Sequence, residues 1–390
     1  MDQTNKEGKI PKDYYSFEDY ANENRVLRDG NEITVRFADI PAVLEAAWKL
    51  VKFYKALYDQ GAFFPGDLKK SIYFHAKTGE RMFDDFDKVR KFGGKVYAED
   101  RFHEYRAPEL ILGETDTYTQ ETENWTMAVY LYELFYHSGG PFKGFSSMLE
   151  NFFDQEEEYR WMAEKGIFTM EENLCENRPV HGVQDRLIKY WELYPEELRQ
   201  CFREIFVDGK KDVSLRKTPK EWQMVLNRLK TQYLMCTCGK KGFVSEFEKT
   251  KEGHYRCPVC GKIYYTFESG ENRIYLSNDT KLMQWQLNPK DTENNTCIGM
   301  VVENKQRKGV FGIKNMTQEE WTGIYPGGEV RPIVPGGGIP LWQGLGITFK
   351  EDCVWGIKGE TKTESKLPDQ PEMTQEERQE GEDNDGCNEA

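Results

Sequence analysis

The sequence of 390 residues lacks any long hydrophobic run. No apolar stretch reaches the roughly 18 residues that a membrane-spanning helix requires, so we expect no such helix. The N-terminal residues 1–7 also lack the apolar centre of a secretory signal peptide. These two absences predict a cytoplasmic protein.

The sequence also lacks an excess of basic side chains. Lys and Arg number 53 against 67 Asp and Glu, which gives a formal net charge of −14 at pH 7. Nucleic acids and anionic membranes both attract basic surfaces, so we expect neither of them as a partner. Charged residues make up 31% of the chain, which predicts a polar surface.

The cysteines fall into two groups. Five of the nine are scattered along the chain, a distribution that favours reduced thiols over disulfide bonds. The other four form two close pairs separated by 18 residues, Cys236 with Cys238 and Cys257 with Cys260. Four thiolates on two tight turns are typical of a structural, tetrahedral zinc site, and buried free thiols are the alternative. We expect the nearby His254 to be a surface residue.

Composition divides the chain into five segments. Residues 1–40 are mixed and polar, and residues 41–230 carry helical periodicity. Residues 231–265 hold the cysteine pairs, and residues 266–358 are rich in Gly, Val, Ile and Trp with frequent turns, which predicts short strands. Residues 359–390 are acidic with almost no large apolar side chains, which predicts a disordered tail. We therefore expect a multidomain α+β protein.

Two helices can be placed from their patterns. Residues 41–59 carry apolar side chains at helical spacing, with Asp39 placed to cap the start and Gly61 to close the end. Residues 125–136 are apolar on almost every side, which predicts a helix that is buried all round. Between these helices, residues 77–80 predict a turn that joins two short strands.

Several short motifs follow one another in the order found in the C-terminal lobe (C-lobe) of a protein kinase. They are Asp67-Leu68-Lys69, Asp85-Phe86-Asp87, Tyr105-Arg106-Ala107-Pro108-Glu109-Leu110, the apolar run from Trp125, Pro141-Phe142-Lys143-Gly144 and Leu215-Arg216-Lys217-Thr218-Pro219. The 18 positions from Asp67 to Asp85 equal the separation between the catalytic-loop and metal-binding aspartates of kinases. For the apolar run, an ordinary core helix in an unrelated helical domain is the alternative.

The chain resembles the bacterial serine/threonine protein-kinase-like proteins of tellurite-resistance and stress gene clusters. In that family the catalytic turn reads like Asp-Leu-Asn-Asp-Gly-Asn-Phe-Phe, followed by Pro-Lys-Thr-Gly and then Asp-x-Asp. The matching stretches here are 67–74, 76–79 and 85–87, and no gap is needed. Over roughly residues 9–358, the resemblance implies a mainly helical kinase-like C-lobe, a zinc ribbon and a forkhead-associated-like (FHA-like) β-sandwich.

The resemblance also implies roles for individual residues. Asp67 would orient the acceptor hydroxyl, with Lys69 beside it in the catalytic loop. Asp85 and Asp87 would hold Mg-ATP. The alternative is that these aspartates are inherited polar residues of a degenerate loop.

The resemblance also singles out positions that concern the stability of the fold and positions where residues needed for kinase activity are replaced. In kinases the Glu of Ala-Pro-Glu is tied to an Arg near the last helices, so we expect an ion pair between Glu109 and Arg216. Ile72 replaces the Asn that normally binds a second metal ion, and it has no oxygen ligand. Pro65 and Gly66 replace the usual His and Arg before the catalytic Asp.

The upstream half of a kinase has no counterpart in residues 1–40. Five strands and a helix need well over about 60 residues. The segment contains neither Gly-x-Gly-x-x-Gly nor an apolar strand that ends in Lys. Residues 9–15 resemble the hinge between the kinase lobes, so we expect the N-terminal lobe (N-lobe) to be largely missing.

The segment 266–358 resembles an FHA β-sandwich less specifically. Residues 299–304 are typical of an early strand, and residues 334–341 with 346–349 of a closing hairpin. The Gly-Arg and Ser-x-x-His turns that bind phosphothreonine in that family are absent from these residues. We therefore expect the fold without its usual ligand.

Two function classes remain open. One is a degenerate or truncated kinase-like protein that acts as a regulatory scaffold in bacterial stress-related phosphosignalling. The resemblance implies protein partners for it, among them a metal-dependent protein phosphatase and a von Willebrand A-type protein. The other class is an ATP-dependent Ser/Thr protein kinase that is completed by a separate N-lobe or partner chain.

Overall fold

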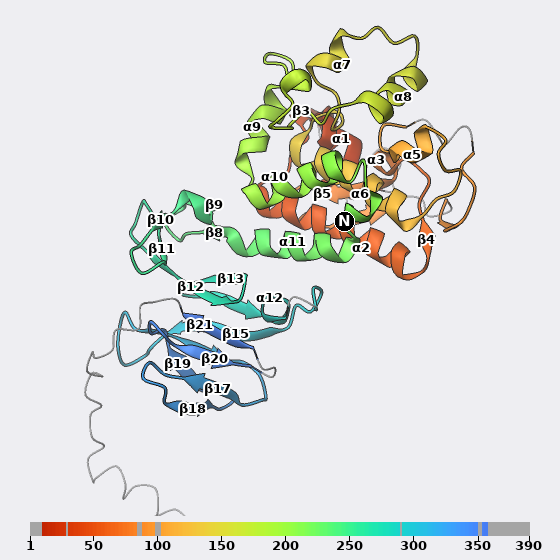
Figure 1. Cartoon of the computed structure of the whole chain (residues 1–390). Helices are drawn as coiled ribbons and strands as arrows, with labels where there is room; N and C mark the ends of the chain where they lie inside the picture. Colours follow the sequence, from red (N-terminus) through yellow and green to blue (C-terminus); the bar gives the residue numbers. More distant parts are fainter. Residues whose placement is uncertain are drawn as a thin grey trace, which may run out of the picture.

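The computed structural model describes residues 10–28, 30–83, 88–97, 103–288, 291–349 and 353–357. Within these ranges the protein is mixed α+β, with 11 α-helices and several antiparallel sheets. Figure 1 shows a helical body, a small region of short strands at the end of helix α11 (Pro219–Gln232), and a β-sandwich that lies across α11 from the other helices. The mixed α+β class is therefore as predicted. The predicted acidic tail, residues 359–390, lies outside the described residues.

The secondary structure of the described residues is as follows. The α-helices are α1 (Phe17–Asn22), α2 (Ile40–Asp59), α3 (Leu68–Ser71), α5 (Pro108–Ile111), α6 (Gln120–Tyr136), α7 (Phe145–Leu149), α8 (Gln155–Lys165), α9 (Asp185–Leu193), α10 (Glu196–Arg203), α11 (Pro219–Gln232) and α12 (Gln284–Leu287). Short 3-10 or π turns are η1 (Cys175–Asn177), η2 (Glu204–Asp208), η3 (Val213–Leu215) and η4 (Val244–Glu246). The strands are β1 (Tyr14–Ser16), β2 (Arg25–Arg28), β3 (Asn31–Thr34), β4 (Ala62–Phe63), β5 (Ile72–His75), β6 (Arg81–Phe83), β7 (Arg90–Lys91), β8 (Tyr233–Met235), β9 (Lys241–Phe243), β10 (Glu248–Lys249), β11 (Tyr255–Arg256), β12 (Ile263–Ser269), β13 (Asn272–Leu276), β14 (Lys281–Met283), β15 (Cys297–Glu303), β16 (Phe311–Asn315), β17 (Trp321–Ile324), β18 (Val330–Ile333), β19 (Gly338–Pro340), β20 (Gly346–Thr348) and β21 (Val354–Ile357).

Helix α6 lies at the centre of the helical body. Every residue from Thr122 to Tyr136 is buried, and α6 packs against α1, α2 and α9. Thr119 caps its start by accepting a hydrogen bond from the Thr122 N–H at 3.3 Å. The prediction of a helix buried all round is confirmed, although the helix begins earlier than the apolar run, at Gln120.

Helix α2 follows its predicted bounds closely. Asp39 caps its first turn by accepting a hydrogen bond from the Ala42 N–H at 3.1 Å. Gly61, just after the helix, adopts a φ of +62°, in the left-handed region that glycine enters without strain. The predicted turn at residues 77–80 is also present, because it joins the paired strands β5 and β6.

Residues 10–28 and 30–40 are part of the helical body. Strand β1 pairs with β5, and β2 and β3 form a hairpin. Phe17 and Tyr20 of α1 are fully buried in the same apolar core as α6. This part of the chain therefore builds β1, α1 and one hairpin, and no five-stranded sheet.

The β region continues directly from the helical body. Helix α11 ends at Gln232 and β8 begins at the next residue. Strand β12 belongs to the cysteine-bearing region at one end and to the sandwich at the other, since it pairs with β11, β13 and β21. The predicted boundary between residues 265 and 266 therefore falls inside a continuous strand.

The sandwich consists of two sheets around one apolar core. One sheet contains β12, β13, β21, β20, β17 and β18, and the other has the order β14-β15-β16-β19. Side chains such as Val301, Ile313, Ile347 and Trp355 fill the space between them. The predicted closing hairpin is wrong, because β19 pairs with β16 and β20 pairs with β17 and β21. Buried Leu345 lies in the link that crosses between the sheets.

Polar contacts dock the sandwich on α11. Asn227 donates a hydrogen bond to the Thr292 carbonyl at 3.0 Å, and the Thr292 hydroxyl donates to Gln223 at 2.7 Å. Glu293 forms an ion pair with Lys52 of α2 at 2.6 Å.

Among the described helices, none combines the length and the apolar character needed to cross a membrane.

Glu109 and Arg216, which the sequence predicts to pair, form a bidentate ion pair. The two Arg216 Nη atoms donate to the two Glu109 carboxylate oxygens at 2.6 and 2.9 Å. Arg216 also donates to the carbonyls of Gly209 at 2.8 Å and Glu121 at 3.1 Å. Its side chain is fully buried, and its guanidinium lies over the Trp125 ring. One side chain therefore ties α5 and the η2 segment to the start of α6.

Replacement of Glu109 by Ala should destabilise the protein strongly, because it leaves the buried Arg216 charge without its partner. We expect a loss of about 3–5 kcal/mol in the free energy of unfolding, measured in urea. Glu329→Ala is the matched control, because Glu329 and Arg331 form a similar two-bond pair in solvent. That control should lose less than about 1 kcal/mol. Equal small losses in both variants would contradict a structural role for the buried pair.

Candidate functional site

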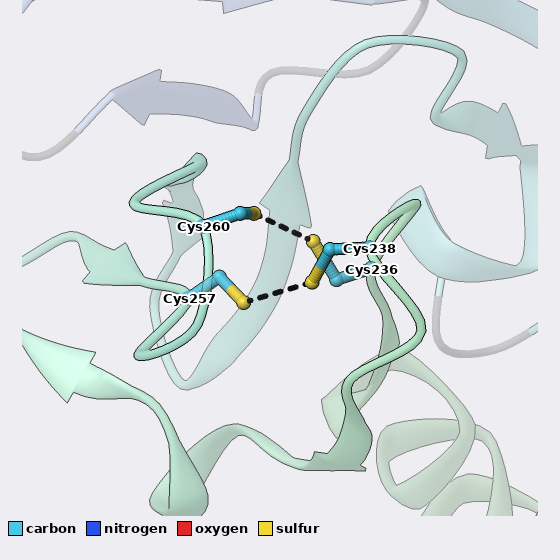
Figure 2. Close-up of side chains that lie close together, drawn as sticks. All are labelled: Cys236, Cys238, Cys257 and Cys260. Carbon is cyan, nitrogen blue, oxygen red and sulfur yellow. Dashed lines mark hydrogen bonds between the residues drawn. The ribbon is translucent and has the colours of Figure 1, made fainter.

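The four paired cysteines lie together in the region between α11 and the sandwich. The four sulfur atoms all lie within 4.8 Å of one another, and Figure 2 shows them facing a common centre. The Sγ atoms of Cys236 and Cys260 are 3.4 Å apart, and those of Cys238 and Cys257 are 3.6 Å apart. The structure thus brings together all four cysteines that the sequence predicts to form a site.

These distances fit a tetrahedral metal ion. A Zn–S bond of about 2.3 Å in tetrahedral geometry puts the sulfur atoms about 3.8 Å apart. A disulfide bond, in contrast, needs sulfur atoms about 2.05 Å apart. The four cysteines can therefore hold a metal ion, and they are not cross-linked to each other.

Each cysteine pair sits on a tight turn that requires glycine. The Gly239 N–H donates to the Cys236 carbonyl at 2.9 Å, and the Gly261 N–H donates to the Cys257 carbonyl at the same distance. The φ angles of Gly239 and Gly261 are +97° and +75°, in the region that side chains disfavour. The turns therefore aim both cysteines of each pair toward the shared centre.

His254 is not a surface residue, so that prediction is wrong. Its side chain is 3% exposed, and its Nδ1 atom accepts a hydrogen bond from the Thr266 N–H at 3.2 Å. The ring packs edge-on against Tyr265 of β12. Among the described residues the metal cluster contains cysteines alone, and His254 holds the neighbouring strand in place.

Asp67, the predicted catalytic aspartate, caps the short helix α3. Its Oδ1 atom accepts a hydrogen bond from the Lys69 N–H at 2.9 Å. The Tyr130 hydroxyl of α6 lies 3.5 Å from the same oxygen and accepts a hydrogen bond from the Leu68 N–H at 3.1 Å. The half-buried Asp67 carboxylate thus has a structural partner within its own loop.

Lys69, the second predicted catalytic residue, lies between two carboxylates. Its Nζ atom forms ion pairs with Glu133 of α6 at 2.6 Å and with Glu104. The Glu133 side chain is 1% exposed, and that of Lys69 is 14% exposed. Burial alone lowers the pKa of Lys69, but the charges of Glu133 and Glu104 outweigh it and hold the pKa above its usual value. Lys69 therefore offsets part of the cost of burying Glu133, whose pKa burial still raises.

Ile72, Asp85 and Asp87 are the other positions that the kinase-like pattern singles out in this part of the chain. Ile72 is fully buried at the end of α3 and the start of β5, where its side chain packs in the core. Asp85 and Asp87, predicted to hold Mg-ATP, lie outside the described residues. Hence the structure places Asp67 and Lys69 together at the start of helix α3.

A second buried carboxylate on α6 was not foreseen from the sequence. Glu123 is buried, and burial raises its pKa to about 7, while the charge of Arg106 opposes this shift. Arg106 is 1% exposed, donates to the Pro65 carbonyl and lies over the rings of Tyr105 and Tyr118. The sequence feature that could have revealed this carboxylate is an ionisable side chain within an otherwise apolar helix.

Comparison with known proteins adds no assignment. No protein-family model matches the chain, and a search of curated proteins found no match either. Functional inference therefore depends on the residues and contacts described above.

Proposed function

We propose that this chain is a kinase-like regulatory scaffold that does not itself transfer phosphate. Its α2, buried α6 and Glu109–Arg216 pair support a likeness to a kinase C-lobe, and the two-sheet sandwich supports a likeness to an FHA domain. By the same resemblance, its role lies in bacterial stress-related phosphosignalling. The partners proposed on that basis are a metal-dependent protein phosphatase and a von Willebrand A-type protein.

The position of Lys69 carries this proposal. In phosphoryl transfer, positively charged groups must face the phosphates and neutralise developing charge. Lys69 instead faces Glu133 and Glu104, so its charge is already compensated within the protein. The Asp67 carboxylate accepts a hydrogen bond from the Lys69 N–H of its own segment, and Ile72 offers no oxygen for a metal ion. The polar groups of this loop therefore serve the fold.

The purified full chain, incubated with labelled ATP and Mg²⁺ or Mn²⁺, should show no more autophosphorylation or ATP hydrolysis than an Asp67→Asn variant. Loss of positioning alone removes about 7–11 kcal/mol of barrier lowering, which is enough to abolish measurable turnover. Activity of the wild-type chain that disappears in Asp67→Asn would refute the proposal. Activity that appears only after addition of a separately produced kinase N-lobe would establish the alternative, a kinase completed by another chain.

We further infer that the four-cysteine cluster binds zinc and that the ion is structural. Four thiolates with tetrahedral spacing suit zinc, and all four positions are filled by protein sulfur, which leaves none for a substrate. Cys236 and Cys257 are buried against Leu234, Phe247 and Tyr264. Metal binding at such a site is coupled to folding of the surrounding strands.

Elemental analysis of the purified protein should find one zinc ion per chain. Cys257→Ser should lose the ion and lower the thermal unfolding midpoint, because the strands β8–β12 lose their cross-link. Cys175→Ser, at an exposed cysteine away from the cluster, should retain both the zinc and the midpoint. Zinc-free protein with four freely titratable thiols at positions 236, 238, 257 and 260 would refute this inference.

A further inference from the structure

Helix α7 presents its apolar side chains to solvent. Phe145, Met148 and Leu149 are 43%, 46% and 66% exposed. Their i, i+3, i+4 spacing places them on one face of the helix. In a soluble domain the apolar face of a helix ordinarily packs against the core. The orientation of α7 is therefore the reverse of the usual one.

The polar side of α7 is fixed to the helical body by Asn177, which is fully buried. Its side-chain oxygen accepts hydrogen bonds from the Ser146 hydroxyl at 2.8 Å and the Ser147 N–H at 3.3 Å. Its amide group donates to the carbonyls of Phe142 and Ile167 at 2.8 and 2.6 Å. Because Asn177 determines which side of α7 faces inward, the outward direction of the apolar face is built into the fold.

Phe153, in the link to α8, is a further exposed apolar side chain, four residues after Leu149. Its side chain is 93% exposed, although its backbone is held in place. The Phe153 N–H donates to the Glu157 carboxylate at 2.7 Å, and the Glu157 N–H donates to Asp154 at 2.9 Å. The preceding Phe152 packs against Trp161 of α8. A large aromatic ring is thus presented to solvent from an ordered turn.

Acidic groups border this face at the link between α7 and α8, while the Arg178 guanidinium lies over the Phe145 ring. Residues 143–178 contain nine acidic and four basic side chains, a net charge of −5. Glu150, Asp154, Glu156 and Glu157 are exposed around the link between α7 and α8. An exposed apolar face with a charged rim is typical of a protein interaction site.

We propose that residues 145–157, which carry this exposed apolar face and its acidic rim, dock a segment of a partner protein. The docked segment combines apolar side chains with lysines or arginines. The acidic rim selects this occupant, since it attracts basic segments and repels both anionic membranes and a second copy of the same face. Figure 1 shows α7 and α8 at the end of the helical body farthest from the sandwich, where a partner meets no obstacle from the β region. The inference is independent of whether the chain transfers phosphate.

The test uses the full chain and two synthetic helical peptides, one with a leucine face and a lysine face, the other with glutamate in place of lysine. The lysine peptide should bind the wild-type chain, and the glutamate peptide should not. The double variant Leu149→Ser with Phe153→Ser should weaken binding about tenfold or more, because it removes the two most exposed apolar anchors. Glu150→Gln should weaken binding mainly at low salt.

Val330→Ser is the matched control, because Val330 is 60% exposed on β18 of the sandwich and should leave binding unchanged. All substituted side chains are exposed, so circular dichroism should show unaltered folding. Equal binding to wild type and the double variant, or no binding to either, would overturn the proposal. Two other results would also overturn it, if neither peptide binds. One is self-association of the wild type that the double variant abolishes, and the other is binding of the wild type to anionic lipid vesicles that the double variant abolishes.

Discussion

Charge compensation around the buried helix α6 is the constraint on which the rest of the helical body depends. An apolar helix can be buried on all sides at little cost, but α6 carries the buried carboxylates Glu123 and Glu133. Burying a carboxylate is costly unless a positive group lies close to it. Lys69 pairs with Glu133, and the charge of Arg106 acts on Glu123. Arg216 adds a third contact, to the backbone at the start of the helix.

These three cations come from three separate segments of the chain, each of which contains one of the short motifs noted in the sequence. The short helix α3 after β4 supplies Lys69, the segment before α5 supplies Arg106, and the turn before α11 supplies Arg216. Their convergence on α6 gives each of these three residues a structural role in the helical body. Under the proposed function, these residues hold the fold together, and the proposed docking of a partner lies elsewhere, at α7 and its link to α8.

Most of the features that could be predicted have a local signal. The Glu109–Arg216 ion pair is the exception, because it joins residues 107 positions apart and was expected only from the resemblance to kinases. The caps of α2, the uniform burial of α6 and the two cysteine turns follow from residues close together in the sequence. The partners of Lys69 could not be predicted, because Glu104 and Glu133 are distant in sequence and meet only in the folded chain. The burial of His254 depends likewise on strand β12, which also carries the chain across the predicted domain boundary.

Helix α7 is a second case in which the sequence pattern alone does not determine the structure. Its apolar spacing alone favours an inward apolar face, whereas the buried Asn177 accepts hydrogen bonds from the Ser146 hydroxyl and the Ser147 backbone N–H. A single buried amide, remote in sequence, thus decides the orientation of a short helix. Because this polar contact overrides the apolar pattern, the apolar side chains of α7 remain exposed, and they form the surface proposed to dock a partner.

A double-mutant cycle measures directly whether Lys69 stabilises the buried helix α6. Lys69→Met, Glu133→Gln and the double variant are compared with the wild type by urea unfolding. If the pair is structural, Lys69→Met alone is strongly destabilising, and the double variant loses less than the two single losses combined. The expected coupling energy is about 1–3 kcal/mol. Additive effects, or a Lys69→Met variant as stable as the wild type, would contradict the account.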